Sequence, residues 1–216
     1  MEQLRPDAEL IQRSDAWFEA RIGCLTASVI GKALSTLKRS GDRTQAAIDL
    51  MYDLAAERVT GLPAKRSNPM SWGVDHEDEA RASYAFLTNA EVVKVGFVRH
   101  PAIPDAGCSP DALVGADGAL EIKAPTSGTH LQTLLADDVP EEHLPQLHWV
   151  LACTGREWID FVSYDPRFPD PLQFFQKRVM RDAAVILDME ADARDFLSEL
   201  GGKLLELDEL YPVAAA

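Results

Sequence analysis

The chain has 216 residues, the size of one domain, and its 21 Lys and Arg against 35 Asp and Glu give a formal net charge of −14. Apolar residues make up 46% of the chain, which is enough for a sizeable core. No apolar run exceeds the length of Trp149–Cys153, far too short to cross a bilayer, and the first twenty residues hold five acidic side chains and no segment typical of a secretory signal. Three widely spaced cysteines argue against a disulfide framework, a zinc ribbon and an iron–sulfur cluster. We therefore expect a single domain over residues 1–216, with a cytoplasmic location and no membrane partner.

The charge is unevenly distributed along the chain. Residues 21–66 contain eight basic and four acidic side chains, whereas residues 182–216 contain two basic and nine acidic ones. Phosphate contacts depend on the local density of Lys and Arg, so an acidic exterior can coexist with a basic channel for nucleic acid. The simpler alternative for the acidic tail is a solvated face that keeps the protein soluble.

Hydrophobic periodicity and capping residues predict helices, then a strand-rich middle, then helices again. The expected elements, in chain order, are a short helix capped by Ser14 or Asp15, a helix from Thr26 or Ser28, a basic loop at 38–43, a helix from Thr44 to Gly61, a helix from Trp72 to Leu87, strands at 91–99 and 157–164, a helix at 141–154, and an amphipathic helix at 181–200 within an acidic helical segment, 181–211. The predicted class is α/β (α+β), a small central mixed β-sheet flanked by α-helices.

The most informative stretch surrounds residues 112–124. Glu121 and Lys123 are two apart on a predicted strand, so they point to the same face of the sheet. Asp111 precedes a strand that the turn signal Asp117-Gly118 joins to theirs. The length of the loop between the two strands decides whether Asp111 shares their face.

Two loop geometries fit this turn. A two-residue turn at 117–118 would send Asp111 to the opposite face of the sheet. A three-residue loop at 116–118 would pair Asp111 with Lys123 and would gather the polar side chains on one face. We favour the second, because its third position requires a left-handed conformation and Gly118 would occupy it.

Two carboxylates beside an ammonium group suggest metal-assisted chemistry. Oxygen ligands of this kind suit Mg²⁺ or Mn²⁺, which bind through one or two carboxylates, water and substrate phosphate. A neighbouring lysine can orient a metal-activated water, help to deprotonate it, and then stabilise the charge that builds on phosphorus. The alternative is an ordinary Glu–Lys pair on a solvated edge strand, and the spacing alone does not decide between the two.

The wider pattern is more specific. Pro110-Asp111 with Glu121-Ile122-Lys123 resembles the PD-(D/E)xK nuclease signature. Five motifs in order, covering about residues 14–170, resemble the lambda-exonuclease-type alkaline nucleases of the YqaJ viral recombinase family: Trp17-x-x-x-Arg21-x-Gly23-x-x-Thr26-Ala27-Ser28, Trp72-Gly73-x-x-x-Glu77-x-x-Ala80-Arg81, Cys108-Ser109-Pro110-Asp111, Leu120-Glu121-Ile122-Lys123 and Tyr164-Asp165-Pro166-Arg167.

This resemblance implies a restriction-endonuclease-like core and a Mg²⁺-dependent 5′→3′ exonuclease that degrades one strand of linear duplex DNA. The implied reaction is a two-metal-type phosphodiester hydrolysis that leaves 3′ single-stranded tails for recombination by strand annealing. Mn²⁺ would substitute, and Ca²⁺ would bind without supporting cleavage. The resemblance also implies a single-strand annealing protein as partner and a ring-shaped homotrimer around DNA.

The resemblance also assigns roles to individual residues. The implied metal ligands are Asp111, Glu121 and the Ile122 carbonyl, and Lys123 would be the catalytic lysine. Glu77 would face the metals from a helix. The implied 5′-phosphate contacts are Arg21, Ser28 and Ser109. Arginine forks onto phosphate through two hydrogen bonds, and hydroxyls add donors. Glu77 has an alternative as a surface pair with Arg81, and Ser28 has one as a helix cap.

One position departs from the family pattern. Relatives tend to carry Gln-x-Gln after the signature, and this chain has Gln146-Leu147-His148. We expect Gln146 and His148 to act at the site, with His148 in place of a glutamine. The alternative for His148 is a buried helical histidine held by a backbone group.

The basic loop is a candidate DNA contact. Lys38, Arg39 and Arg43 lie between two predicted helices in the basic part of an acidic chain. We expect them to hold DNA through phosphate contacts; the alternative is a solvated loop with mobile side chains.

Two rival functions remain. A restriction-like endonuclease would cut within the strand and would need no pocket for a terminal phosphate. A non-catalytic DNA-end-binding protein on the same fold would have no reason to keep Asp111, Glu121 and Lys123 together.

Overall fold

The computed structural model describes residues 10–63 and 71–212, with the backbone alone at 71–75. The helices are α1 (Asp15–Arg21), α2 (Ala27–Ala33), α3 (Gln45–Thr60), α4 (Ser71–Thr88), α5 (Ser127–Ala136), the 3-10 helix η2 (Glu141–His143), α6 (Leu144–Thr154) and α7 (Ala183–Leu210). The strands are β1 (Leu25–Thr26), β2 (Val92–Val93), β3 (Val98–Arg99), β4 (Ala106–Cys108), β5 (Ala112–Val114), β6 (Gly118–Lys123), β7 (Trp158–Tyr164) and β8 (Phe174–Met180).

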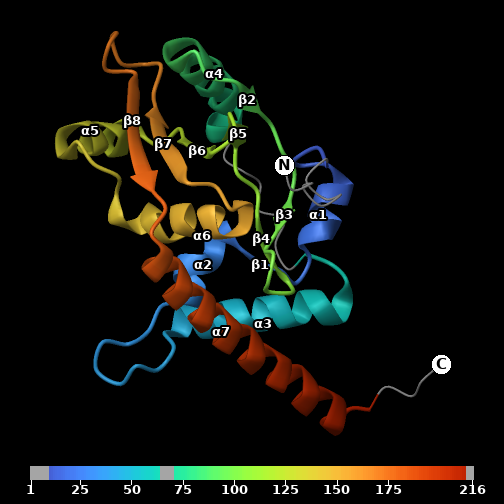
Figure 1. Ribbon diagram of the computed structural model, residues 1–216. Helices are drawn as coiled ribbons and strands as arrows, with labels where there is room; N and C mark the ends of the chain where they lie inside the picture. Colours follow the sequence, from blue (N-terminus) through green and yellow to red (C-terminus); the bar gives the residue numbers. More distant parts are fainter. Residues whose placement is uncertain (1–9, 64–70, 213–216) are drawn as a thin grey trace.

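The strands form two sheets that lie between helices (Figure 1). The larger sheet has the order β2-β5-β6-β7-β8, and the smaller has the order β1-β4-β3. Both are mixed, because β6 and β7 pair in parallel, as do β1 and β4, while the other pairs are antiparallel. The predicted class, a mixed β-sheet flanked by α-helices, is confirmed.

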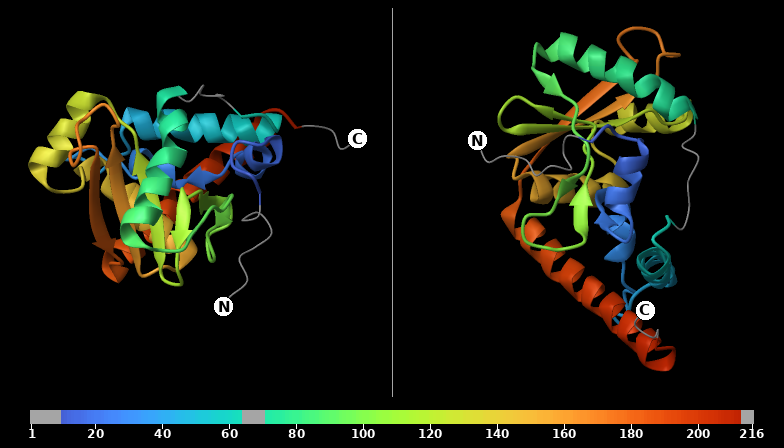
Figure 2. Two further views of the ribbon diagram at one scale, coloured as in Figure 1. Left: turned by 90° about the horizontal axis from the view of Figure 1, so that it is seen from above. Right: turned by 90° about the vertical axis from the view of Figure 1, so that its right-hand side faces the viewer.

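The two faces of the larger sheet bury different cores. Alternate residues of β6 and β7 point to opposite faces. One face packs against α6, α2 and α3, and its cluster includes Ala119, Phe161 and Trp149. The other face packs against α4, and its cluster includes Leu120 and Tyr84. Figure 2 shows α4 and α6 on opposite sides of these strands. By the same alternation, Glu121 and Lys123 belong to the face that α6 covers.

Local capping explains where the N-terminal helices begin and end. Ser14 caps α1 through its side chain, which accepts a hydrogen bond from the Trp17 amide, and Thr44 caps α3 in the same way. Gly61 ends α3 in the left-handed conformation. These boundaries agree with the predicted ones.

The prediction of one strand over 91–99 is wrong. The segment forms β2 and β3, which join different sheets, because β2 pairs with β5 and β3 pairs with β4. Val95 and Phe97 between them are both buried, so the link packs its side chains into the core without belonging to a ladder.

The predicted hairpin register is also wrong, by two residues. β5 and β6 pair Ala112 with Leu120 and Val114 with Gly118, so the loop is 115–117, and Asp111 lies opposite Glu121 rather than Lys123. Gly115 takes the left-handed conformation with φ +52°, whereas Gly118 lies in β6, where a Cβ would collide with the Trp158 ring. Gly118 is therefore needed for close packing rather than for the turn. A shift of two residues keeps the same face, so Asp111 still shares a face with Glu121 and Lys123.

The C-terminal helix α7 fills almost all of the segment predicted to be helical, 181–211, and extends past the amphipathic part at 181–200. Asp182 caps α7, and the helix continues through Gly201 and Gly202 to Leu210 because Leu204 still packs against the core. Its last turns project away from the body of the molecule (Figure 2). None of the helices in the described part of the chain combines the length and hydropathy of a transmembrane segment.

Candidate active site

The candidate active site lies where β5 begins and β6 ends. Asp111 immediately precedes β5, and its Oδ2 accepts a hydrogen bond of 2.6 Å from the backbone N–H of Ile122. Glu121 and Lys123 follow on β6, and Lys123 Nζ lies 2.6 Å from Glu121 Oε1. The structure therefore brings Asp111, Glu121 and Lys123 together, and it adds the amide of Ile122 as a support for Asp111. The Ile122 carbonyl as a ligand stays a prediction.

Glu121 is almost fully buried, with 3% of its surface exposed. Its Oε1 accepts hydrogen bonds from Lys123 and from Gln146 Nε2. Its Oε2 is buried and has no hydrogen-bond partner. An unpartnered buried carboxylate oxygen is costly, so this atom fits a position beside a cation.

The charge around Asp111 leads to the same inference. Burial raises the pKa of Asp111 well above its usual value, and the neighbouring charges of Glu121 and Glu77 raise it further; the Ile122 amide and Lys123 act in the opposite direction. The site therefore concentrates more negative charge than its own groups balance.

Lys123 is held as an ammonium ion. Burial lowers its pKa, but the charges of Glu121, Asp111 and Glu77 outweigh burial and raise the pKa above its usual value. In this arrangement Lys123 can donate hydrogen bonds and stabilise negative charge.

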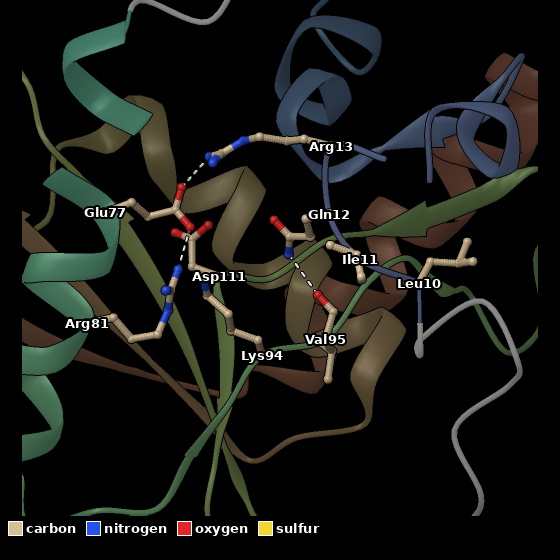
Figure 3. A pocket seen from close by; sticks show the side chains of 9 residues that line it. All are labelled: Leu10, Ile11, Gln12, Arg13, Glu77, Arg81, Lys94, Val95 and Asp111. Atoms are coloured by element: carbon tan, nitrogen blue, oxygen red, sulfur yellow. Dashed lines mark hydrogen bonds and ion pairs between the residues drawn. The ribbon is translucent and has the colours of Figure 1, made fainter. Parts of the chain in front are cut away.

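Glu77 approaches Asp111 from α4, as the resemblance implied. Figure 3 shows Glu77 above Asp111, with Arg13 and Arg81 reaching it from opposite sides. Both arginines form ion pairs with Glu77, so the predicted surface pair with Arg81 is present as well. Arg81 is itself buried and also contacts Asp78, so the pair is part of the site wall rather than an isolated surface contact. The side chain of Trp72, in the same motif, lies outside the described residues.

The donor set fits a hard divalent cation that shares its ligands with substrate. Within the described residues, no three His, Cys, Asp or Glu side chains form a metal site by themselves. Mg²⁺ needs less, because it binds through one or two carboxylates and completes its shell with water and phosphate oxygens. Asp111 and Glu121 Oε2 would supply those carboxylates.

Helix α6 contributes Gln146 but turns His148 away. Gln146 Oε1 accepts a hydrogen bond of 3.2 Å from Lys123, and its amide donates to Glu121. Side chains two residues apart on an α-helix point in directions about 200° apart around its axis, so His148 and Gln146 lie on nearly opposite faces of α6. Burial lowers the pKa of His148, and the charge of Asp182, the N-cap of α7, acts in the opposite direction. The Nδ1 atom of His148 is buried without a hydrogen-bond partner. Gln146 lines the pocket of Lys123 and His148 does not, so a role for His148 at the site stays a prediction that this geometry does not favour.

The sequence interpretation missed His143. Its side chain lines the same pocket as Lys123, Gln146, Ser28 and Lys32. The spacing of three residues from Gln146 was the available signal, because such residues share a helix face. Arg13 was also missed, and no motif marks it.

The predicted phosphate contacts lie next to this pocket. Arg21 Nη1 donates to Ser109 Oγ at 2.9 Å, and Trp17 Nε1 donates to the same oxygen at 3.0 Å. The guanidinium lies 4.1 Å from the centre of the Trp17 ring. Ser28 is exposed and lines both the pocket that holds Arg21 and the pocket that holds Lys123. It does not cap α2, because Thr26 occupies the N-cap position.

A tight turn holds Arg21 in place. Gly23, with φ +65°, donates its amide to Glu57 Oε2 at 2.8 Å, and its carbonyl accepts from Arg58 Nε at 3.0 Å. Both partners come from the end of α3. A Cβ on Gly23 would collide with the Arg58 side chain. Glycine is therefore required at this position for two reasons, the positive φ and the close approach of Arg58.

The basic loop divides into two parts. Lys38 and Arg39 are exposed, whereas Arg43 donates to Glu199 on α7 at 2.8 Å and to the Ala33 carbonyl at 3.2 Å. Arg43 thus ties the loop to the C-terminal helix. DNA contact stays a prediction for all three residues, and the geometry favours it for Lys38 and Arg39.

Comparison with known proteins supports the resemblance. Residues 16–157 match the model of the YqaJ-like viral recombinase domain. The alkaline exonuclease LHK-Exo from Laribacter hongkongensis is 37% identical over 91% of this chain and 97% of that chain, with a TM-score of 0.84, and its complex with dAMP gives 0.85 at the same identity and coverage. A phage-related exonuclease from Haemophilus somnus 129PT, 14% identical over 85% of this chain and 95% of that chain, has a TM-score of 0.62 and shares the fold. No curated protein gave a significant sequence match.

A mixed sheet that gathers Asp111, Glu121 and Lys123 beside an arginine–serine pocket defines a nuclease of the alkaline exonuclease fold. The chain belongs to the YqaJ-like viral recombinase family, as its sequence motifs indicated.

Proposed function

We propose that this protein is a Mg²⁺-dependent 5′→3′ exonuclease that degrades one strand of linear duplex DNA and leaves a 3′ single-stranded tail. The observation that carries the proposal is the buried, unpartnered Oε2 of Glu121 beside Asp111, with Lys123 2.6 Å from the other oxygen. A DNA exonuclease role is consistent with family membership and with the 37% identity to an alkaline exonuclease.

Each residue of the site has its own role in the proposed reaction. When bound, Mg²⁺ would lower the pKa of a water and offset charge on the scissile phosphate. Asp111 and Glu121 would hold the ion, and the Ile122 amide keeps Asp111 in position. Lys123 would donate to the phosphate oxygens as negative charge builds on them. Gln146 fixes the carboxylate of Glu121, since it donates to the oxygen that Lys123 also contacts.

The proposed 5′→3′ direction depends on the pocket of Arg21. Arg21 and Ser109 would bind a terminal 5′-phosphate, and Ser28 lies between that pocket and Lys123. A strand whose 5′ end occupied this pocket would place its first phosphodiester near the carboxylates. We further propose a single-strand annealing protein as partner and a ring-shaped homotrimer as the assembly that holds duplex DNA.

The test uses duplex DNA with one strand labelled at either end. A 5′→3′ exonuclease releases a 5′ label as mononucleotide at once and shortens a 3′-labelled strand progressively, only when Mg²⁺ is present. A closed circular duplex should stay intact. Cleavage of the circle would indicate the endonuclease alternative, and binding to ends without degradation would indicate the non-catalytic one.

A further inference from the structure

One histidine in the wall of the Lys123 pocket has no role in the function proposed above. His143 ends η2, directly before α6, and lines the pocket together with Lys123, Gln146, and Ser28 and Lys32 of α2. Its side chain is 23% exposed, so the imidazole is partly covered and still reaches the pocket.

The orientation of this ring is fixed by the sheet. The imidazole stacks on Phe161, with ring centres 5.3 Å apart and planes inclined by 27°. Phe161 pairs with Glu121 in the β6–β7 register, so the histidine rests on the residue beside the metal-binding carboxylate. Glu142 Oε1 is 3.8 Å from Nε2 of the imidazole, too far for a hydrogen bond.

The position relative to the two phosphate sites indicates what His143 would meet. Ser28 belongs to the pocket of Arg21, and Lys123 lies at the carboxylates. In the proposed reaction, only the 5′-terminal nucleotide lies between a phosphate at Arg21 and the scissile phosphate at Lys123. The pocket that His143 lines contains both Ser28 and Lys123, so the same nucleotide would pass it.

Building on the proposed function, we propose that His143 donates a hydrogen bond to a backbone oxygen of the 5′-terminal nucleotide and is a further DNA-contacting side chain of the pocket that holds Lys123.

The charges around the imidazole are compatible with this role. Burial lowers the pKa of His143, and the charge of Lys123 lowers it further, while Glu142 and Glu121 act in the opposite direction. Lys32, from α2, lines the same pocket. A neutral imidazole keeps one N–H donor, and it can approach DNA beside Lys123 without repelling that ammonium group.

Two substitutions separate a DNA contact from a packing role. His143→Phe keeps a ring on Phe161 and removes the donor, whereas His143→Gln keeps a donor and removes the ring. The readouts are kcat/KM on 5′-phosphorylated linear duplex, the affinity for the same DNA in Ca²⁺, and the melting temperature. His143→Leu is a second donor-free variant in case His143→Phe folds poorly.

The proposal predicts that the Phe variant loses about tenfold in both kcat/KM and affinity, the effect of one lost hydrogen bond, while the Gln variant stays within about threefold of wild type. If the Gln variant is impaired and the Phe variant is normal, the ring only packs, and the proposal is overturned. Donor-free variants that bind and cleave DNA normally would also overturn it. The affinity measurement needs no catalysis, so it decides the role of His143 even if the wild-type protein fails to degrade DNA, a result that would refute only the proposed function.

Discussion

The Asp111 carboxylate accepts a hydrogen bond from the backbone N–H of Ile122 at 2.6 Å, so the strand that carries Glu121 and Lys123 also positions Asp111. The same closeness crowds the carboxylates: burial raises the pKa of Asp111, and the charges of Glu121 and Glu77 raise it further. The site is thus assembled by the backbone at an electrostatic cost that a bound cation would offset.

The first prediction concerns metal and stability. The pKa of Asp111 is raised in the folded protein, so its contribution to stability is present in acid and is lost as the pH rises through that folded pKa. At pH values well above that pKa, Asp111→Asn should therefore raise the melting temperature of the metal-free protein. Mg²⁺ should raise the melting temperature of the wild type and should have little effect on this variant. If Mg²⁺ stabilises both proteins equally, the ion binds elsewhere.

The second prediction concerns Lys123. Lys123→Ala should keep DNA affinity in Ca²⁺ and reduce turnover by about 10²–10³-fold, the usual effect of removing a donor that stabilises transition-state charge. The comparison needs single-turnover rates on linear duplex together with binding data for the same substrate. Residual activity of about a tenth of wild type would be too high for this role, since losing such a donor typically costs far more.

A third prediction separates terminal-phosphate binding from general DNA contact. Arg21→Ala should lower kcat/KM on 5′-phosphorylated DNA much more than on 5′-hydroxyl DNA, because a charge-assisted hydrogen bond is worth roughly 1.5–3 kcal/mol. Trp17→Phe is the matched control: it keeps an aromatic ring near the guanidinium and removes only the donor to Ser109. Equal losses on both substrates would assign Arg21 to general backbone contact.

The fourth prediction concerns the basic loop. Replacing Lys38 and Arg39 with alanine should reduce the salt dependence of log K by about 0.9 for each lost contact on duplex DNA. Arg43→Ala should instead destabilise the fold by about 1 kcal/mol, because it removes hydrogen bonds to Glu199 and Ala33. Glu199→Gln is the control for that effect. An unchanged salt slope in the Lys38 and Arg39 double variant would exclude the loop from the DNA path.

The sequence predicted those parts of the site that local rules determine. The caps Ser14 and Thr44 gave the helix starts, and the two-residue period placed Glu121 and Lys123 on one face. The register of Asp111 was missed because Gly118 looked like a turn residue, and only the Trp158 ring packed against it shows its other role.

The remaining errors come from contacts between distant segments. His148 was placed by analogy with a glutamine, and it does not line the pocket that Gln146 and Lys123 share. Arg13 reaches Glu77 from a segment 64 positions away, which no periodicity can indicate.

The most direct test of the central claim is mononucleotide release from 5′-phosphorylated linear duplex by the wild type and by Glu121→Gln, with and without Mg²⁺. The variant keeps an oxygen and an amide in place of the carboxylate, so the fold should survive, as its melting temperature would confirm. We expect release by the wild type only with Mg²⁺, and no release by the variant under either condition. Release by the wild type without any divalent ion, or by the variant at the wild-type rate, would contradict the account.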